Sequence, residues 1–280
     1  MSGRVAIDIG APSVLVFRGP DAERYLNGQL TQDVRRAGSG QTFPSCVTDA
    51  KGRLQFRVWI ARDDEGAFLV QGEPGIADDL EARLTRYLIA DDVDVSRPDP
   101  PFRMMHLTGD SPAPPERVVS LGCARFGGPG ADWWIPDGFD IGIPDEWKLL
   151  AGDEFEAFRI RRGTPAWGRE LFEGLLPPEA VLEASDISYQ KGCYIGQEVI
   201  SRMKRAGKTN KRLVHAVVDE AVPDDDLALA GPDGSDAGFL TSVSPLAHDG
   251  VFHVLGYVNR GATECFAAAP GGRRQPLRPL

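Results

Sequence analysis

The sequence predicts an α+β body followed by a small C-terminal β-barrel or sandwich. Over residues 1–107 the strand and helix patterns follow the order β-α-β-β-α-β, the split arrangement of ferredoxin-like domains. From Lys211 onward, short apolar runs such as LVHAVV, GFLTSV and VFHVLGYV alternate with Gly and Asp turns, which is typical of small barrels. We therefore expect a body at 1–207 with a break between subdomains near 100–150, a barrel at 208–270 and a frayed tail at 271–280.

The strands of the body are recognised as short apolar runs between turn residues. Runs at 14–17, 68–70 and 102–107 fit this description, and the run at 46–60 is divided by the turn Asp49-Ala50-Lys51-Gly52. The pair Trp133-Trp134 follows a Gly-rich loop, which indicates the start of another buried strand rather than a partner-facing patch.

The helices are indicated by apolar spacing and by end signals. In the clearest helix, the apolar residues lie on one face at spacings of four and three: Ile76, Leu80, Leu84, Tyr87 and Leu88. A short helix is expected at 22–26 after the turn Gly19-Pro20-Asp21, and another at 154–162, where Gly163-Thr164-Pro165 ends the pattern.

Composition limits the classes of function. The chain has 280 residues, of which 42% are hydrophobic and 26% are charged, and no apolar run approaches the ~18 residues that cross a bilayer. The first residues resemble neither a secretory nor an organellar address, so we expect a cytoplasmic protein with no membrane partner. We also expect a monomer. The formal net charge of -10 argues against nucleic acid as the main partner.

One segment is basic, although the chain as a whole is acidic. Between Val199 and Val218 there is no acidic residue, and the segment contains six basic ones: Arg202, Lys204, Arg205, Lys208, Lys211 and Arg212. This basic stripe suits a polyglutamate tail or an acidic partner protein, although most charge runs are simply solvated faces.

The cysteines are few and scattered. Cys46, Cys123, Cys193 and Cys265 include no CxxC pair and have no His at ligand spacing, so we predict no stable metal site and no disulfide framework. A thiol oxidoreductase would need a second, resolving cysteine near the first, and the sequence offers no local one.

Cys193 nevertheless lies in an unusual setting, the stretch KGCYIGQE at residues 191–198. It precedes a short helix that ends at Gly207, and Lys191 is two residues away; a helix N-terminus and a nearby cation both favour a thiolate. Gly192 and Gly196 would let the backbone turn sharply. The alternative is that Cys193 is a small, buried and inert residue.

The motifs of this chain resemble those of the YgfZ-type family, which is related to the glycine-cleavage T-protein. The resemblance rests on KGCYIGQE, on residues 19–33 with GPDA and YLNGQLTQD, on DAKGR at 49–53, and on 159–168 and 176–180. Residues 213 onward occupy the place of the family's C-terminal barrel. The resemblance implies a ring-like α+β body that holds folate in a central hollow, with the cysteine loop beside it.

The resemblance also implies a set of functional residues. Lys191 and Cys193 become candidate catalytic residues, with Cys193 as the reactive thiol or a transient contact to a cluster. Candidate tetrahydrofolate or loop-holding residues are Tyr194, Gln197, Glu198, Asp33 and Phe155. Each has an alternative structural role: Lys191 as a solvated residue, Tyr194 and Phe155 as core aromatics, Gln197 and Glu198 as first-turn helix residues, and Asp33 as an N-cap.

Two departures separate this chain from aminomethyltransferases of the T-protein type. After Gly52 it reads Arg53-Leu54-Gln55-Phe56, where T-proteins place the Asp that organises transfer. It also has Arg161 where they carry the Glu used for the pterin ring, and an Arg only donates hydrogen bonds. A third position, Ser13, replaces an aromatic residue of folate-binding relatives.

Members of the YgfZ-type family bind folate and assist iron-sulfur cluster assembly and repair, so the resemblance implies one function, and the relation to the T-protein implies one alternative. We expect a folate-binding accessory factor that assists assembly or repair of [4Fe-4S] proteins without conventional turnover, and whose partners are iron-sulfur assembly proteins or client apoproteins. The alternative is a tetrahydrofolate-dependent aminomethyl or methyl transferase.

Overall fold

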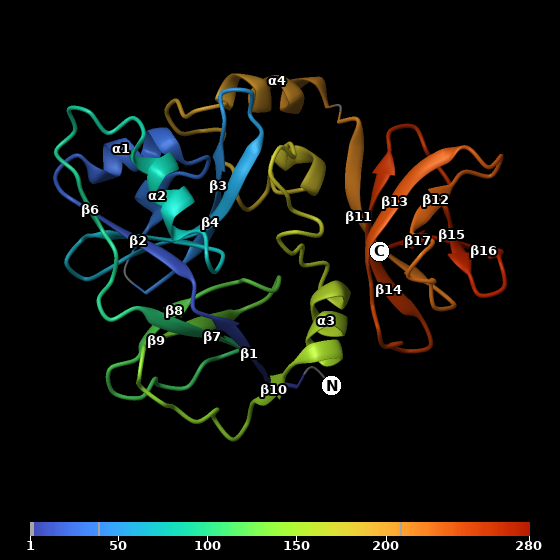
Figure 1. Cartoon of the computed structure of the whole chain (residues 1–280), viewed down its shortest axis with the longest axis horizontal. Coiled ribbons are helices and arrows are strands. Elements are labelled where there is room, and N and C mark those ends of the chain that lie inside the picture. Colours follow the sequence, from blue (N-terminus) through green and yellow to red (C-terminus); the bar gives the residue numbers. More distant parts are fainter. Residues whose placement is uncertain (1–2, 39, 208) are drawn as a thin grey trace. The chain divides into compact units, whose positions relative to one another are not determined.

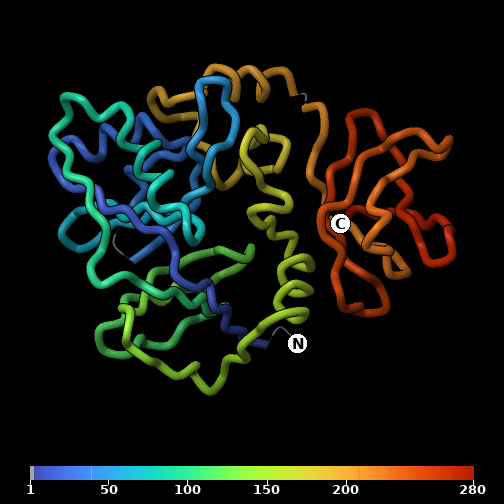
Figure 2. The backbone as a smooth tube through the Cα atoms, in the orientation of Figure 1, coloured from blue at the N-terminus to red at the C-terminus, as the bar shows by residue number. Residues whose placement is uncertain are grey.

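The structure, a computed structural model, describes residues 3–38, 40–207 and 209–280, which form two compact units (Figure 1). Unit 1 contains Met1–Leu150 and Leu182–Ser201, and unit 2 contains Ala151–Val181 and Arg202–Leu280. Figure 2 lets the reader follow the yellow-green segment that separates the two parts of unit 1 along the chain. The expected body and barrel boundaries stay predictions, and Lys208, at their junction, lies outside the described residues.

The first sheet of unit 1 is antiparallel and has the strand order β3-β4-β5-β2-β6. Its strands are β2 (Ser13–Arg18), β3 (Phe43–Thr48), β4 (Leu54–Arg62), β5 (Phe68–Gly72) and β6 (Asp94–Ser96). The helices α1 (Ala22–Gln29) and α2 (Ala77–Thr85) contribute to the core of this sheet, and a 3-10 turn, η1 (Val34–Arg36), follows α1.

The alternation of side chains along β2 explains why this sheet is covered on both faces. Leu15 and Phe17 pack into the core shared with the two helices, whereas Val14, of opposite parity, packs against Met104 and Trp134 of the second sheet. A strand buried on both faces reads as a continuous apolar run, as SVLVFR does.

The second sheet of unit 1 has the order β10-β1-β7-β9-β8. Its strands are β1 (Val5–Gly10), β7 (Phe102–Thr108), β8 (Val119–Gly122), β9 (Gly130–Pro136) and β10 (Lys148–Leu150), and only the β1–β10 pairing is parallel. The expectation that 102–107 closes the split β-α-β-β-α-β unit was therefore wrong. The short strand β6 pairs with β2 and is the last strand of the first sheet. Strand β7 belongs to the second sheet. Trp133 and Trp134 are buried on β9, as expected.

Unit 2 is a nearly closed seven-stranded barrel accompanied by α3 (Gly152–Arg161) and a 3-10 turn, η2 (Pro177–Ala180). The barrel strands are β11 (Lys211–Val218), β12 (Ala228–Ala230), β13 (Asp236–Val243), β14 (Phe252–Asn259), β15 (Phe266–Ala269), β16 (Arg273–Pro276) and β17 (Arg278–Pro279). The frayed tail expected at 271–280 is wrong, because β16 and β17 pair with β15 and β11 and Leu277 is buried in the barrel core.

The helix α4 (Gln197–Ala206) joins the second part of unit 1 to unit 2. It ends at Gly207, whose amide donates to the carbonyl of Met203 and whose φ of +61° marks the expected left-handed C-cap. Among the described residues, no helix is long and apolar enough to cross a membrane.

A buried ion pair fastens segment 151–181 to the barrel. Arg159 Nη1 lies 3.0 Å from Glu170 Oε2, and Glu170 Oε1 accepts bonds from Thr241 and Ser242 of β13 at 2.7 and 2.6 Å. The backbone carbonyl of Glu170 accepts from the Tyr257 hydroxyl at 2.7 Å. Because the Glu170 carboxylate is fully buried, its cost of desolvation is offset only while these partners are present.

We expect Glu170→Ala to lower the free energy of unfolding by about 3–5 kcal/mol, because it removes the fully buried one of the two carboxylates that pair with the buried Arg159 guanidinium and leaves only the partly exposed Glu156. Urea unfolding followed by circular dichroism measures the change. Glu173→Ala is the matched control, since Glu173 is exposed and three residues away. A loss below about 1 kcal/mol for Glu170→Ala would contradict this account.

Candidate functional site

The residues around Cys193 form an irregular loop at 188–196, the cysteine loop, which precedes α4 and belongs to unit 1. Both ends of the loop are bound to other segments by hydrogen bonds. The amide of Ser188 donates to Thr31 O at 3.0 Å, and the amide of Ile195 donates to Gly28 O at 3.2 Å. Thr48 Oγ1 donates to Ile195 O at 2.6 Å. The loop is thus attached to the end of α1 and to β3.

A close backbone contact fixes the end of the cysteine loop. Gly196 has a φ of +86°, and a Cβ there would lie 2.6 Å from Asp49 O and 2.8 Å from Gly52 Cα. Gly52, with a φ of +71°, meets the Gly196 carbonyl and the start of α4 in return. Only glycine satisfies both the left-handed conformation and the lack of space.

Three sequence motifs therefore meet at one place. YLNGQLTQD supplies Gly28 and Thr31, DAKGR supplies Gly52, and KGCYIGQE supplies Ile195 and Gly196. The three motifs are far apart in the sequence, so the sequence alone does not show that they are neighbours. In the fold, YLNGQLTQD binds the cysteine loop by a backbone hydrogen bond and DAKGR contacts it through Gly52.

Lys191 is directed into the protein. Its Nζ donates to Leu30 O at 2.6 Å and to Gln32 O at 2.7 Å, just beyond the C-terminus of α1. The alternative of a solvated lysine is wrong, because the side chain is buried and this burial lowers its pKa to about 7. The contacts give Lys191 a loop-holding role, and its catalytic role stays a prediction.

Tyr194 packs in a small core with Ile187, Tyr189 and Ile200. Its hydroxyl is buried and has no hydrogen-bond partner in the described part of the chain, and burial raises its pKa. The core-aromatic role expected as an alternative is thus the one its contacts show.

Cys193 itself is exposed, between buried Lys191 and buried Tyr194. The expectation of a buried cysteine as the alternative is therefore wrong, the reactivity of Cys193 stays a prediction, and Cys46, Cys123 and Cys265 are the buried cysteines. Gln197 and Glu198 form the first turn of α4, where Gln197 is partly buried and Glu198 is exposed. Their ligand-binding roles stay predictions.

Asp33 and Ser13 both accept a hydrogen bond from a backbone amide near the start of a helix. Asp33 is the N-cap of η1, where its carboxylate accepts from the Arg35 amide at 3.1 Å and pairs with the Arg35 guanidinium, which lowers the pKa of Asp33. Ser13 Oγ accepts from the Ile76 amide at 3.0 Å, directly before α2. A structural reason thus exists for a small hydroxyl residue at position 13.

The segment that leads into the cysteine loop is held by a buried ion pair that sequence reasoning missed. Arg57 Nε lies 2.7 Å from Asp186 Oδ2, Thr31 Oγ1 donates to Asp186 O at 2.6 Å, and Asp186 is fully buried. The Arg57 guanidinium lies over the Trp59 ring, as does that of Arg125. No local pattern marks this pair, because its members are separated by 129 residues.

Phe155 and Arg161 lie on α3 in unit 2, whereas the cysteine loop is in unit 1. Phe155 is partly buried and Arg161 is exposed. Their folate-related roles stay predictions.

In unit 1, the Gln55 side chain, near the position where T-proteins place their Asp, accepts a bond from Arg83 Nε at 2.5 Å. The Gln55 amide oxygen is therefore occupied by a charge-assisted hydrogen bond from a guanidinium.

Comparison with known structures defines the fold class. The chain superposes on glycine cleavage system aminomethyltransferase T from Bartonella henselae with a TM-score of 0.83, over 99% of this chain and 85% of that one, at 17% identity. The protein thus has the T-protein fold, as expected from its motifs.

Sequence relatives of the chain are less than 30% identical to it. No family model matches the chain. It is 28% identical over 215 residues to an uncharacterized protein of Haemophilus influenzae, covering 71% of this chain and 68% of the relative. It is 26% identical over 222 residues to the tRNA-modifying protein YgfZ of Klebsiella pneumoniae, with 71% and 67% covered, and 25% identical over 231 residues to the Escherichia coli O157:H7 protein of that name, with 75% and 70% covered. Together with the fold, these relatives support a YgfZ/T-protein-like family for this chain.

We expect Gly196→Ala to destabilise unit 1 by about 1–3 kcal/mol from its left-handed backbone alone, with a further loss from the overlap with Asp49 O and Gly52 Cα. Chemical denaturation gives the free energy of unfolding. Gly192→Ala is the control in the same loop, since its φ is ordinary and nothing lies within 4 Å of a Cβ there. Equal stability of the two variants would mean that the contact is not what shapes the loop.

The buried Lys191 predicts a pH dependence of stability. Its pKa is about 7 in the folded chain and near 10.5 when unfolded, so between these values the unfolded state binds more protons and stability rises with pH. We expect Lys191→Met to remove this rise, as measured by unfolding curves from pH 7 to about 10.5. Lys204→Met, at an exposed lysine, should keep the wild-type slope. The same slope in all three proteins would contradict the prediction.

Proposed function

We propose that this protein is a folate-binding accessory factor that assists the assembly or repair of [4Fe-4S] proteins, with Cys193 as its working thiol. The observation that carries the proposal is the exposure of Cys193 on a loop in which the Lys191 and Tyr194 side chains are buried and Lys191 Nζ is hydrogen-bonded. A thiol that must touch a cluster, a persulfide or a partner protein needs access and a defined position, and the cysteine loop supplies both.

The T-protein fold supports a folate ligand, and tetrahydrofolate is the form we propose. The fold alone does not define the activity, since one fold hosts many functions. Gln55, bonded to Arg83, is a neutral side chain close to where T-proteins place the Asp that organises transfer. This favours an accessory role over aminomethyl or methyl transfer, which is the second candidate because the fold is that of an aminomethyltransferase.

We propose a protein partner, or a short polyglutamate tail, at the local basic stripe and not a nucleic acid, because the chain as a whole is acidic. Two of the relatives are named tRNA-modifying protein YgfZ, but a chain with a formal net charge of -10 is repelled by phosphate backbones. We propose an indirect link, in which the protein maintains iron-sulfur enzymes. The exposed cations of the basic stripe, which include Arg205 and Arg212, are the surface proposed for an acidic partner or a polyglutamate tail.

The test is aconitase activity, normalised to aconitase protein level, in cells that lack this gene and are supplied with wild type, Cys193→Ser or Cys265→Ser. We expect loss of activity without the gene, restoration by wild type and by Cys265→Ser, and no restoration by Cys193→Ser. Cys265 is the control because it is a buried thiol of the barrel core.

The alternative outcomes are informative in different ways. Full activity without the gene would overturn the role in cluster maintenance for this client. Equal restoration by Cys193→Ser would overturn the role of the thiol. Purified protein that transfers a carbon unit to tetrahydrofolate from an aminomethyl or methyl donor would establish the second candidate instead.

A further inference from the structure

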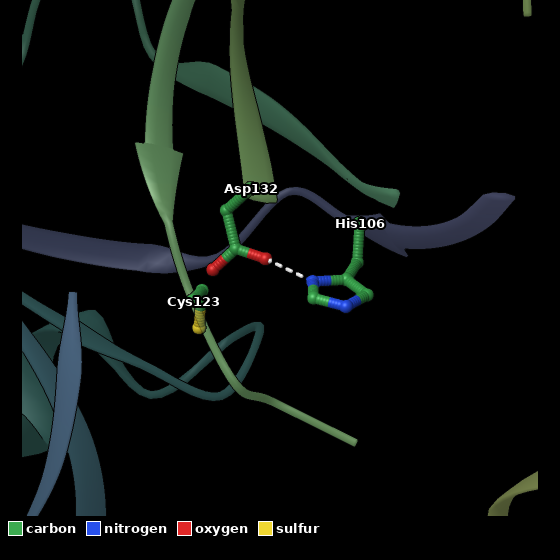
Figure 3. A group of neighbouring side chains, drawn as sticks. All are labelled: His106, Cys123 and Asp132. Carbon is green, nitrogen blue, oxygen red and sulfur yellow. Dashed lines mark hydrogen bonds and ion pairs between the residues drawn. The ribbon is translucent and has the colours of Figure 1, made fainter. Parts of the chain in front are cut away.

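Outside the cysteine loop, three side chains of different ligand types meet in the interior of unit 1. His106, Cys123 and Asp132 are buried, and their ligand atoms all lie within 4.8 Å of one another. Figure 3 shows the three side chains beside one another, with the His106–Asp132 bond drawn as a dashed line. His106 Nδ1 is 2.7 Å from Asp132 Oδ1.

The second sheet places these residues rigidly. His106 on β7 is the direct cross-strand partner of Asp132 on β9, and direct partners point to the same face. Cys123 follows β8 and continues its pairing with β9, because its amide donates to Gly130 O at 2.8 Å. Three adjacent strands thus present one nitrogen, one sulfur and one oxygen to a common space.

Arg125 sets a limit on what this cluster can bind. Its Nη2 donates to Asp132 Oδ2 at 2.7 Å and to Gln71 Oε1 at 2.9 Å, and its Nε donates to Asp132 Oδ1 at 3.3 Å. A nearby guanidinium weakens any purely electrostatic site for a cation. It therefore disfavours Mg²⁺ and Ca²⁺, which depend on charged oxygen ligands, and leaves ions whose bonds to thiolate are strong.

We infer that His106, Cys123 and Asp132 form a binding site for a divalent ion of the Zn²⁺ class, with Arg125 orienting the Asp132 carboxylate from outside. In a tetrahedral site, bonds of 2.0–2.3 Å separate the ligand atoms by about 3.3–3.8 Å, so shifts of the order of an ångström suffice. The site goes beyond the proposed function and departs from the expectation of no stable metal.

Binding changes the protonation of two ligands. Cys123 gives its thiol proton to solvent and binds as thiolate, and His106 binds through Nδ1 with its ring proton on Nε2. The thiolate and the Asp132 carboxylate then carry two negative charges against the two positive charges of the ion, so the charge of Arg125 stays in excess beside the site, and a fourth position is open to water.

The experiment is incorporation of cobalt as a spectroscopic probe. The full chain is produced in zinc-poor medium with Co²⁺, purified without chelators, and its metal content and absorption spectrum are measured for wild type, Cys123→Ser and Cys193→Ser. We expect about one Co²⁺ per chain and a thiolate-to-cobalt charge-transfer band in wild type and Cys193→Ser, and loss of the band in Cys123→Ser.

Two results would overturn the site. The absence of bound cobalt would mean that the cluster is a hydrogen-bonded network only, and a band that is lost in Cys193→Ser would assign the metal to the exposed loop. Should Cys123→Ser fail to fold, X-ray absorption of zinc-loaded wild type and Cys193→Ser decides the question. We expect one sulfur neighbour in both, whereas a shell of only nitrogen and oxygen would overturn the site. Neither result depends on aconitase rescue, so the proposed function is tested separately.

Discussion

The contact of two backbones at Gly196 and Gly52 is the constraint on which the cysteine loop depends. Any side chain at Gly196 would enter the space of the turn that follows β3, and the loop would have to leave α1 and β3, to which its ends are bound. Because the contact holds the main chain, Lys191 and Tyr194 can turn inward while Cys193 between them faces solvent. The exposed thiol is thus a consequence of tight packing on both sides of it.

Buried charge pairs constrain the arrangement of other segments, as the glycine contact constrains the cysteine loop. Arg57–Asp186, Arg125–Asp132 and Arg159–Glu170 each contain a fully buried carboxylate. The first pair joins segments 129 residues apart, and in the two local pairs the carboxylate also binds a side chain of a more distant strand, His106 for Asp132 and Ser242 for Glu170. Such pairs contribute less to net stability than apolar packing, but a wrong register leaves a charge buried alone. They therefore select one arrangement of strands and loops among several that would bury similar apolar area.

Sequence reasoning succeeded where the signal is local and failed where it is not. The strands around DAKGR, the Gly207 cap and the barrel strands follow from alternation and turn residues, which act over a few positions. The direction of the Lys191 side chain and the meeting of His106 with Asp132 depend on pairing between distant segments, for which the sequence has no periodic sign. The last strands were missed for a related reason: an Arg- and Pro-rich stretch resembles a tail until a neighbouring edge pairs with it.

The interleaving of the two units has a consequence for how the chain is made. Unit 1 needs Asp186 as the counter-charge of Arg57, and this residue is synthesised only after segment 151–181, which belongs to unit 2. That segment in turn waits for Thr241 and Ser242 to satisfy Glu170. Neither unit can therefore be completed as a separate N-terminal domain during translation, and the cysteine loop reaches its final form only after most of the chain has left the ribosome.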